Sequence, residues 1–178
     1  LIGPVEVFAA ANHEVARPAY RLRLVAREAG PVRTSSGVTV VADEAMAEVT
    51  GRVDTLVVVG GEGTYRAIGD PDLVRQIARL ADGARRVTSV CSGAFLLAQA
   101  RLLDGRRVTT HWRVCDLLAS TFPEVRVEPD PIFVRDGNVW TSAGVTAGMD
   151  LALALVEDDL GRDVALAIAR RLVLFLRR

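Results

Sequence analysis

The chain has 178 residues, which is the size of about one domain. Half of the residues are hydrophobic and a quarter are charged, a composition that excludes a disordered tail, a collagen-like repeat and a small disulfide scaffold. The 22 basic and 22 acidic residues cancel, so the charge of this segment gives no support for nucleic-acid binding by the segment alone.

The two cysteines and the hydropathy pattern indicate the compartment. Cys91 and Cys115 are too few for a disulfide framework and fit a reducing environment. No apolar run has the length of a membrane span, and the first residues do not resemble a signal peptide. The sequence therefore predicts a cytoplasmic protein without membrane contact.

Helical and strand patterns alternate along the chain. In the first half of the chain, the patterns predict a helix over 4–11, strands over 20–26, 38–41 and 56–59, a helix over 72–80 and a strand over 87–90. In the second half, they predict a helix over 94–100, a strand over 108–110, a helix over 112–119 and an extended segment over 125–127. A hairpin formed by 132–134 and 139–141 and helices over 149–157 and 164–176 complete the prediction. The β-branched run at 56–59 is typical of a strand buried on both faces. We therefore expect an α/β fold with a mainly parallel sheet and an added antiparallel hairpin.

The most informative segment joins a strand to a helix at Cys91. An apolar strand precedes this cysteine, and the small residues Ser92 and Gly93 let a helix begin at once, which is the layout of a nucleophile elbow. Free helical N–H groups at such a turn favour the thiolate. A buried structural cysteine is an equally good interpretation of this local pattern.

Two further segments follow predicted strands. Gly60-Gly61-Glu62-Gly63 follows the strand at 56–59, and its N–H groups could face Cys91 as anion donors. His111 follows the strand at 108–110; taken alone, it is better explained as a structural histidine at a helix start. The scattered His and Cys residues do not have the spacing of a metal site, and no cofactor is expected.

Several motifs together resemble the ThiJ/PfpI superfamily, which has a class I glutamine amidotransferase-like fold. The resemblance is carried by Val90-Cys91-Ser92-Gly93-Ala94, by Leu102-Leu103-Asp104-Gly105-Arg106-Arg107, by Thr109-Thr110-His111-Trp112, and by the stretch from Glu128 to Asp150. Two branches are most similar: the isonitrile hydratases, and the amino-terminal sensor domains of GlxA-like AraC-type transcriptional regulators. The later stretch and the chain's end resemble the regulators most.

The resemblance implies a flavodoxin-like three-layer α/β/α sandwich formed as one domain by residues 1–178. Members of this family have an apolar first strand before the Gly3-Pro4 helix, so we expect that strand to exist upstream of Leu1. In the regulators, a linker and a DNA-binding domain follow the segment that ends here. DNA would therefore be bound only through a domain outside this chain.

The resemblance also implies roles for individual residues. Cys91 matches the elbow cysteine, Glu6 an acidic position beside the thiol, and His111 the Thr-His-Trp histidine near the site. The amides of Gly61 and Ser92 match those that line an oxyanion pocket, with Gly60 beside them. PfpI-type proteases carry His directly after the cysteine, whereas Ser92 stands here, so a Cys-His protease dyad is not expected.

Three functions follow from these residues. The first is a dimeric sensor domain that binds an unknown small-molecule effector in the pocket of Cys91, Gly61, Glu6 and His111. The second is an enzyme in which the Cys91 thiolate attacks an isonitrile or a similar small substrate. The third is a non-catalytic oligomeric domain with a vestigial site. Whether the chain is an enzyme is left open by the sequence, although the resemblance favours a sensor.

Overall fold

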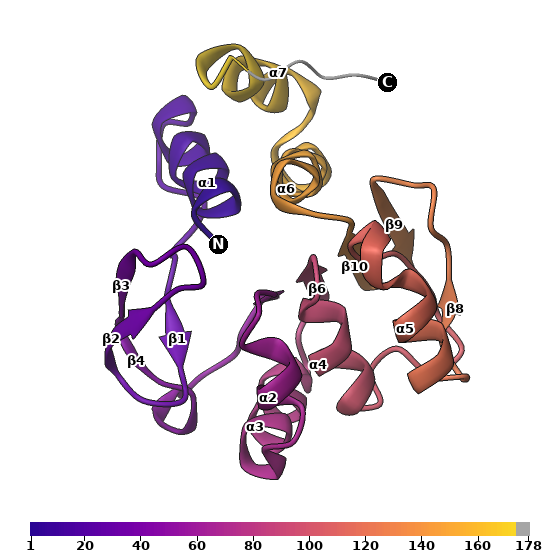
Figure 1. The fold of residues 1–178 in the computed structure, drawn as a ribbon. Coiled ribbons are helices and arrows are strands. Elements are labelled where there is room, and N and C mark those ends of the chain that lie inside the picture. The colour runs from indigo at the N-terminus through magenta and orange to yellow at the C-terminus, as the bar shows by residue number, and fades with distance from the viewer. Residues whose placement is uncertain (174–178) are drawn as a thin grey trace. The chain divides into compact units, whose positions relative to one another are not determined.

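The computed structural model describes residues 1–173, and these form two compact units (Figure 1). Of these residues, one unit combines the first 22 with 145–173, and the other contains Arg23–Gly144. Helices and a mainly parallel sheet make up the fold, which confirms the predicted α/β class. None of the described helices is long and apolar enough to cross a membrane.

The second unit is built on a four-stranded sheet. Its strands are β5 (Thr55–Val59), β6 (Arg86–Val90), β10 (Val139–Ser142) and β9 (Phe133–Asp136), in that spatial order. The pairs β5–β6 and β6–β10 are parallel, and β9–β10 is antiparallel. The predicted hairpin is confirmed, and its second strand also extends the parallel part of the sheet.

Three helices of the second unit contribute residues to its hydrophobic core or pack against it. They are α2 (Thr64–Ala67), α3 (Pro71–Ala81) and α4 (Gly93–Gln99). Leu56, Val58 and Val87 of the sheet belong to one buried cluster with residues of α3 and α4. The helix α3 begins where Pro71 fixes the backbone and the Asp70 carboxylate accepts hydrogen bonds from the amides of the first turn.

Shorter elements complete the second unit. They are β1 (Val25–Ala26) paired with β4 (Glu44–Ala45), β2 (Gly30–Arg33) paired with β3 (Thr39–Ala42), β7 (Arg107–Val108) paired with β8 (Arg126–Val127), the 3-10 turns η1 (Met46–Glu48) and η2 (Trp112–Val114), and α5 (Cys115–Thr121). The strand predicted over 20–26 is confirmed only at its last two residues, where β4 supplies a partner.

The first unit consists of α1 (Ile2–Glu14), α6 (Val145–Leu160) and α7 (Arg162–Arg171). Each of these helices contacts the other two (Figure 1). The Tyr20 hydroxyl donates to Asp159 at 2.8 Å, and its ring packs edge-on against Phe8. The helix predicted over 164–176 ends earlier, at Arg171, and its last predicted residues lie outside the described part.

Candidate functional site

Cys91 occupies a strained turn between β6 and α4. Its φ angle is +58°, in the left-handed region that residues other than glycine seldom adopt. Two hydrogen bonds hold this turn: the Cys91 amide donates to the Ser142 carbonyl, and the Thr110 hydroxyl donates to the Cys91 carbonyl, both at 2.9 Å. The residue is partly exposed. The sharp strand-to-helix turn predicted at Cys91 is therefore present, and the role of the thiol as a nucleophile stays a prediction.

Two glycines let the backbones meet beside the elbow. A Cβ atom on Gly93 would lie 2.2 Å from the Val58 carbonyl oxygen, and one on Gly60 would lie 2.5 Å from the Ser92 amide nitrogen. Neither position has room for a larger residue unless the backbone moves. The strand β5, the loop after it and the start of α4 therefore come into direct backbone contact.

Ser92 is buried and points into the glycine loop. Its Oγ accepts a hydrogen bond from the Gly61 amide at 3.0 Å, and it lies 3.3 Å from both the Gly61 carbonyl and the Thr64 hydroxyl. The resemblance implied that the Gly61 amide faces a ligand, whereas in this structure that amide donates to Ser92. An oxyanion role for the Gly61 and Ser92 amides stays a prediction.

His111 lies at the same end of the sheet as Cys91. It follows Thr110, whose hydroxyl bonds the Cys91 carbonyl, and its Cδ2 lies 3.7 Å from the point where a Cβ on Gly144 would stand. Its Nδ1 accepts a hydrogen bond from the Arg113 amide at 3.3 Å and caps η2. The segment after β7 thus holds the imidazole ring close to the elbow.

Glu6 belongs to the other unit. It lies on α1, and its side chain is exposed. Cys91, Ser92, Gly60, Gly61 and His111 all belong to the second unit. A role for Glu6 beside the thiol stays a prediction.

Tyr65 lies near Cys91 and was not singled out by the sequence analysis. It lies on α2 directly after Thr64, and its ring packs edge-on against Phe95 of α4, with centroids 5.5 Å apart. Burial raises the pKa of the Tyr65 phenol, and the charge of the nearby Cys91 thiolate raises that pKa further. Its position two residues after Gly63, the last residue of the glycine turn, was the only sequence signal that could have identified it.

Cys115 has a structural environment. It is 5% exposed at the start of α5, and its sulfur lies 3.8 Å and 3.7 Å from the carbonyls of Thr110 and His111. Burial raises the pKa of its thiol. These surroundings place Cys115 among the buried residues of the core.

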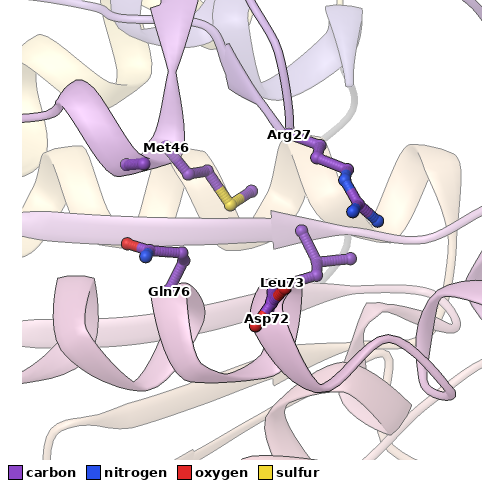
Figure 2. A pocket seen from close by; sticks show the side chains of 6 residues that line it. Arg27, Met46, Asp72, Leu73 and Gln76 are labelled. Carbon is purple, nitrogen blue, oxygen red and sulfur yellow. The ribbon is translucent and has the colours of Figure 1, made fainter.

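A separate pocket lies between η1 and α3 (Figure 2). It has a volume of about 290 Å³ and is lined by Arg27, Met46, Ala47, Asp72, Leu73 and Gln76. Its two charged residues already have partners, because Arg27 pairs with Asp70 and Asp72 pairs with Arg75. No lining residue belongs to the elbow.

Within residues 1–173, no three His, Cys, Asp or Glu side chains gather as a metal would require.

Comparison with known proteins identifies the family. Residues 1–158 match the DJ-1/PfpI family. The chain belongs to this family. A crystal structure of an AraC family transcriptional regulator from Pseudomonas putida superposes with a TM-score of 0.84 and 25% identity, over 96% of this chain and 90% of that one. The flavodoxin-like class that the resemblance implied is confirmed by these matches.

Two curated relatives represent the two branches suggested by the sequence. Isonitrile hydratase from Pseudomonas putida is 37% identical over 165 residues, which cover 93% of this chain and 68% of that protein. The HTH-type transcriptional regulator GlxA from Rhizobium meliloti is 34% identical over 162 residues, which cover 90% of this chain. The matched segment spans 49% of that regulator, about half of its length.

Proposed function

We propose that this chain is the effector-binding and dimerising part of a cytoplasmic AraC-type transcriptional regulator that contacts DNA through a separate domain. The observation that carries the proposal is the match to GlxA, which includes nearly all of this chain and only half of that regulator. The balanced charge of the chain agrees with a role in sensing rather than in DNA contact.

The surroundings of Cys91 support binding more than turnover. A cysteine nucleophile is activated either by a neighbouring base that takes up its proton or by a lowered thiol pKa. Ser92, at the next position, is buried in contact with Gly61 and Thr64 and is no base. His111 uses its Nδ1 lone pair to accept from the Arg113 amide. Within the second unit, the Ser92 hydroxyl and the His111 Nδ1 atom are therefore both engaged in hydrogen bonds with other groups than the Cys91 thiol.

The sensing step would be a shift between conformations of the dimer. An effector that binds at Cys91 more tightly in one arrangement of the two protomers shifts the population toward that arrangement. Attached DNA-binding domains would follow the change.

The first test is the intact mass of the natural protein in its source cells. We expect a mass larger than 19.1 kDa by at least a further domain of about 100 residues. A natural protein with no additional domain would overturn the proposal, because nothing would connect the sensor to DNA.

The alternative is an isonitrile hydratase-like enzyme, which the similarity to the Pseudomonas putida enzyme favours. Addition of the Cys91 sulfur and a proton to the isonitrile carbon would give a thioformimidate. Water would then replace the sulfur, releasing an N-substituted formamide and the free thiol. Formation of N-cyclohexylformamide from cyclohexyl isonitrile, lost in Cys91→Ala, would support the enzyme; no product from the unaltered protein would exclude it for this substrate.

A further inference from the structure

Three consecutive residues form a stacked group directly after Thr110, whose hydroxyl donates to the Cys91 carbonyl. The rings of His111 and Trp112 stack with centroids 5.8 Å apart and planes at 27°, and the Arg113 guanidinium lies 5.1 Å from the centre of the Trp112 ring. The Trp112 side chain is 68% exposed. We refer to His111, Trp112 and Arg113 as the rim triad.

The hydrogen bond at Nδ1 fixes which nitrogen of His111 carries the proton. A backbone amide can only donate, so the Nδ1 atom that receives the Arg113 N–H must have a free lone pair. In the neutral ring the proton is then on Nε2. His111 thus presents an N–H donor through Nε2, which has no hydrogen-bond partner within residues 1–173.

Arg113 adds an uncompensated positive charge to the same group. Its guanidinium forms no ion pair with any carboxylate of the described residues. An N–H donor and a guanidinium that both belong to one stacked group around the exposed Trp112 ring match the acceptor oxygens and the charge of a carboxylate.

We propose that the rim triad is a carboxylate-binding face, so that the small molecules received at the Cys91 site carry a carboxylate group. In this arrangement His111 is a hydrogen-bond donor to the ligand rather than the base for the thiol. The inference rests on the proposed effector site, and it deepens that proposal by naming the chemical class of the ligand.

The tautomer is tested on the protein without any ligand. His13→Gln leaves His111 as the one histidine, whose two ring nitrogens are distinguished by two-bond proton–nitrogen correlation spectra of ¹⁵N-histidine-labelled protein at pH 8. We expect a protonated Nε2 and an unprotonated Nδ1. A protonated Nδ1, or a mixture of the two tautomers, would overturn the donor assignment. The spectrum is independent of whether the chain regulates transcription.

The ligand class is tested with two alkylating probes that differ in charge. Iodoacetate carries a carboxylate and iodoacetamide does not, and peptide mass mapping measures the reaction of each at Cys91. We expect Arg113→Gln and His111→Asn to lower the iodoacetate rate, relative to iodoacetamide, by about fivefold. Asn at position 111 keeps an acceptor for the Arg113 amide, so the turn is retained.

A matched control separates local from general charge effects. Arg126→Gln removes one exposed arginine of the same unit that lies outside the triad, and we expect an unchanged ratio of the two rates. An unchanged ratio in Arg113→Gln, or an equal fall in the Arg126→Gln control, would overturn the carboxylate-binding face even if the tautomer is as assigned.

Discussion

The Gly61 amide donates a hydrogen bond of 3.0 Å to the Ser92 hydroxyl, and this bond ties the glycine loop after β5 to the elbow that carries Cys91. The hydroxyl also lies 3.3 Å from Thr64, at the start of α2. One buried serine therefore links three segments that are up to 31 residues apart.

Ser92→Ala is expected to loosen the glycine loop. It leaves the Gly61 amide without its acceptor, which should lower the free energy of unfolding by about 1–3 kcal/mol. Hydrogen exchange of the amides of residues 61–64 should accelerate. Ser120→Ala is the control, because that hydroxyl is exposed and bonds only within its own helix. Unchanged exchange at Gly61 in Ser92→Ala would contradict this role.

Gly93→Ala is expected to destabilise the protein strongly. The added methyl group would lie 2.2 Å from the Val58 carbonyl oxygen, so backbone must move, at a cost of at least about 3 kcal/mol in unfolding free energy. Denaturant unfolding of Gly63→Ala gives the comparison, since a Cβ there meets nothing within 4 Å. Equal midpoints for the two variants would show that the close approach at Gly93 is not required.

The two cysteines should differ in reactivity. Cys91 is partly exposed, whereas Cys115 is buried and burial raises the pKa of its thiol. With iodoacetamide at pH 7.5 we expect Cys91 to be modified at least about tenfold faster than Cys115. Peptide mass mapping over time measures both rates in one sample. If Cys91 and Cys115 reacted at comparable rates in the native protein, as well as after unfolding in urea, the assigned environments would be contradicted.

The titration of Tyr65 should report on Cys91. The chain has two tyrosines, so Tyr20→Phe leaves Tyr65 as the single phenol, and its ionisation can be followed by absorbance near 295 nm. Burial and the Cys91 thiolate both raise the Tyr65 pKa. Cys91→Ser removes the negative charge, so the Tyr65 pKa should fall while staying above its ordinary value. No change in the Tyr65 pKa on Cys91→Ser would show that the two groups are not coupled.

Ionisation of the Asp150 carboxyl should lower the stability of the fold. Burial within α6 raises the pKa of this carboxyl. A raised folded-state pKa in an acid means that stability falls as pH rises, through the interval between the unfolded and folded pKa values. Asp150→Asn should therefore raise the melting temperature by roughly 1–2 °C at pH 7 and have no effect at pH 3. A lower melting temperature at pH 7 would contradict this sign.

The elbow could be predicted because its determinants are local. A buried β-branched strand, Cys91 and two small residues follow one another in sequence, and each acts on its neighbours. The role of Ser92 could not be predicted in the same way, because its partners on the glycine loop approach through the packing of α4 against β5. Tyr65 was missed for the same reason, since only the fold brings α2 to α4.

The hairpin β2–β3 shows a second limit of local patterns. The strand β2 has the sequence Gly-Pro-Val-Arg, which shows neither alternation of apolar and polar residues nor enrichment in β-branched residues. Its first residue, Gly30, has a φ of +106°. The pairing of β2 with β3 through Val32 and Val40 defines it as a strand. Conversely, the alternation at 20–26 predicted a longer strand than the two residues that find a partner.

The first unit is discontinuous in sequence, and this has a consequence for biosynthesis. The helix α1 packs on α6 and α7, and the chain of the entire second unit lies between them. At ribosomal rates of about 5–20 residues per second, α1 waits on the order of ten seconds for its packing partners to emerge. The apolar face of α1 is open to chaperones during that interval, while residues 23–144 can already assemble around β5 and β6.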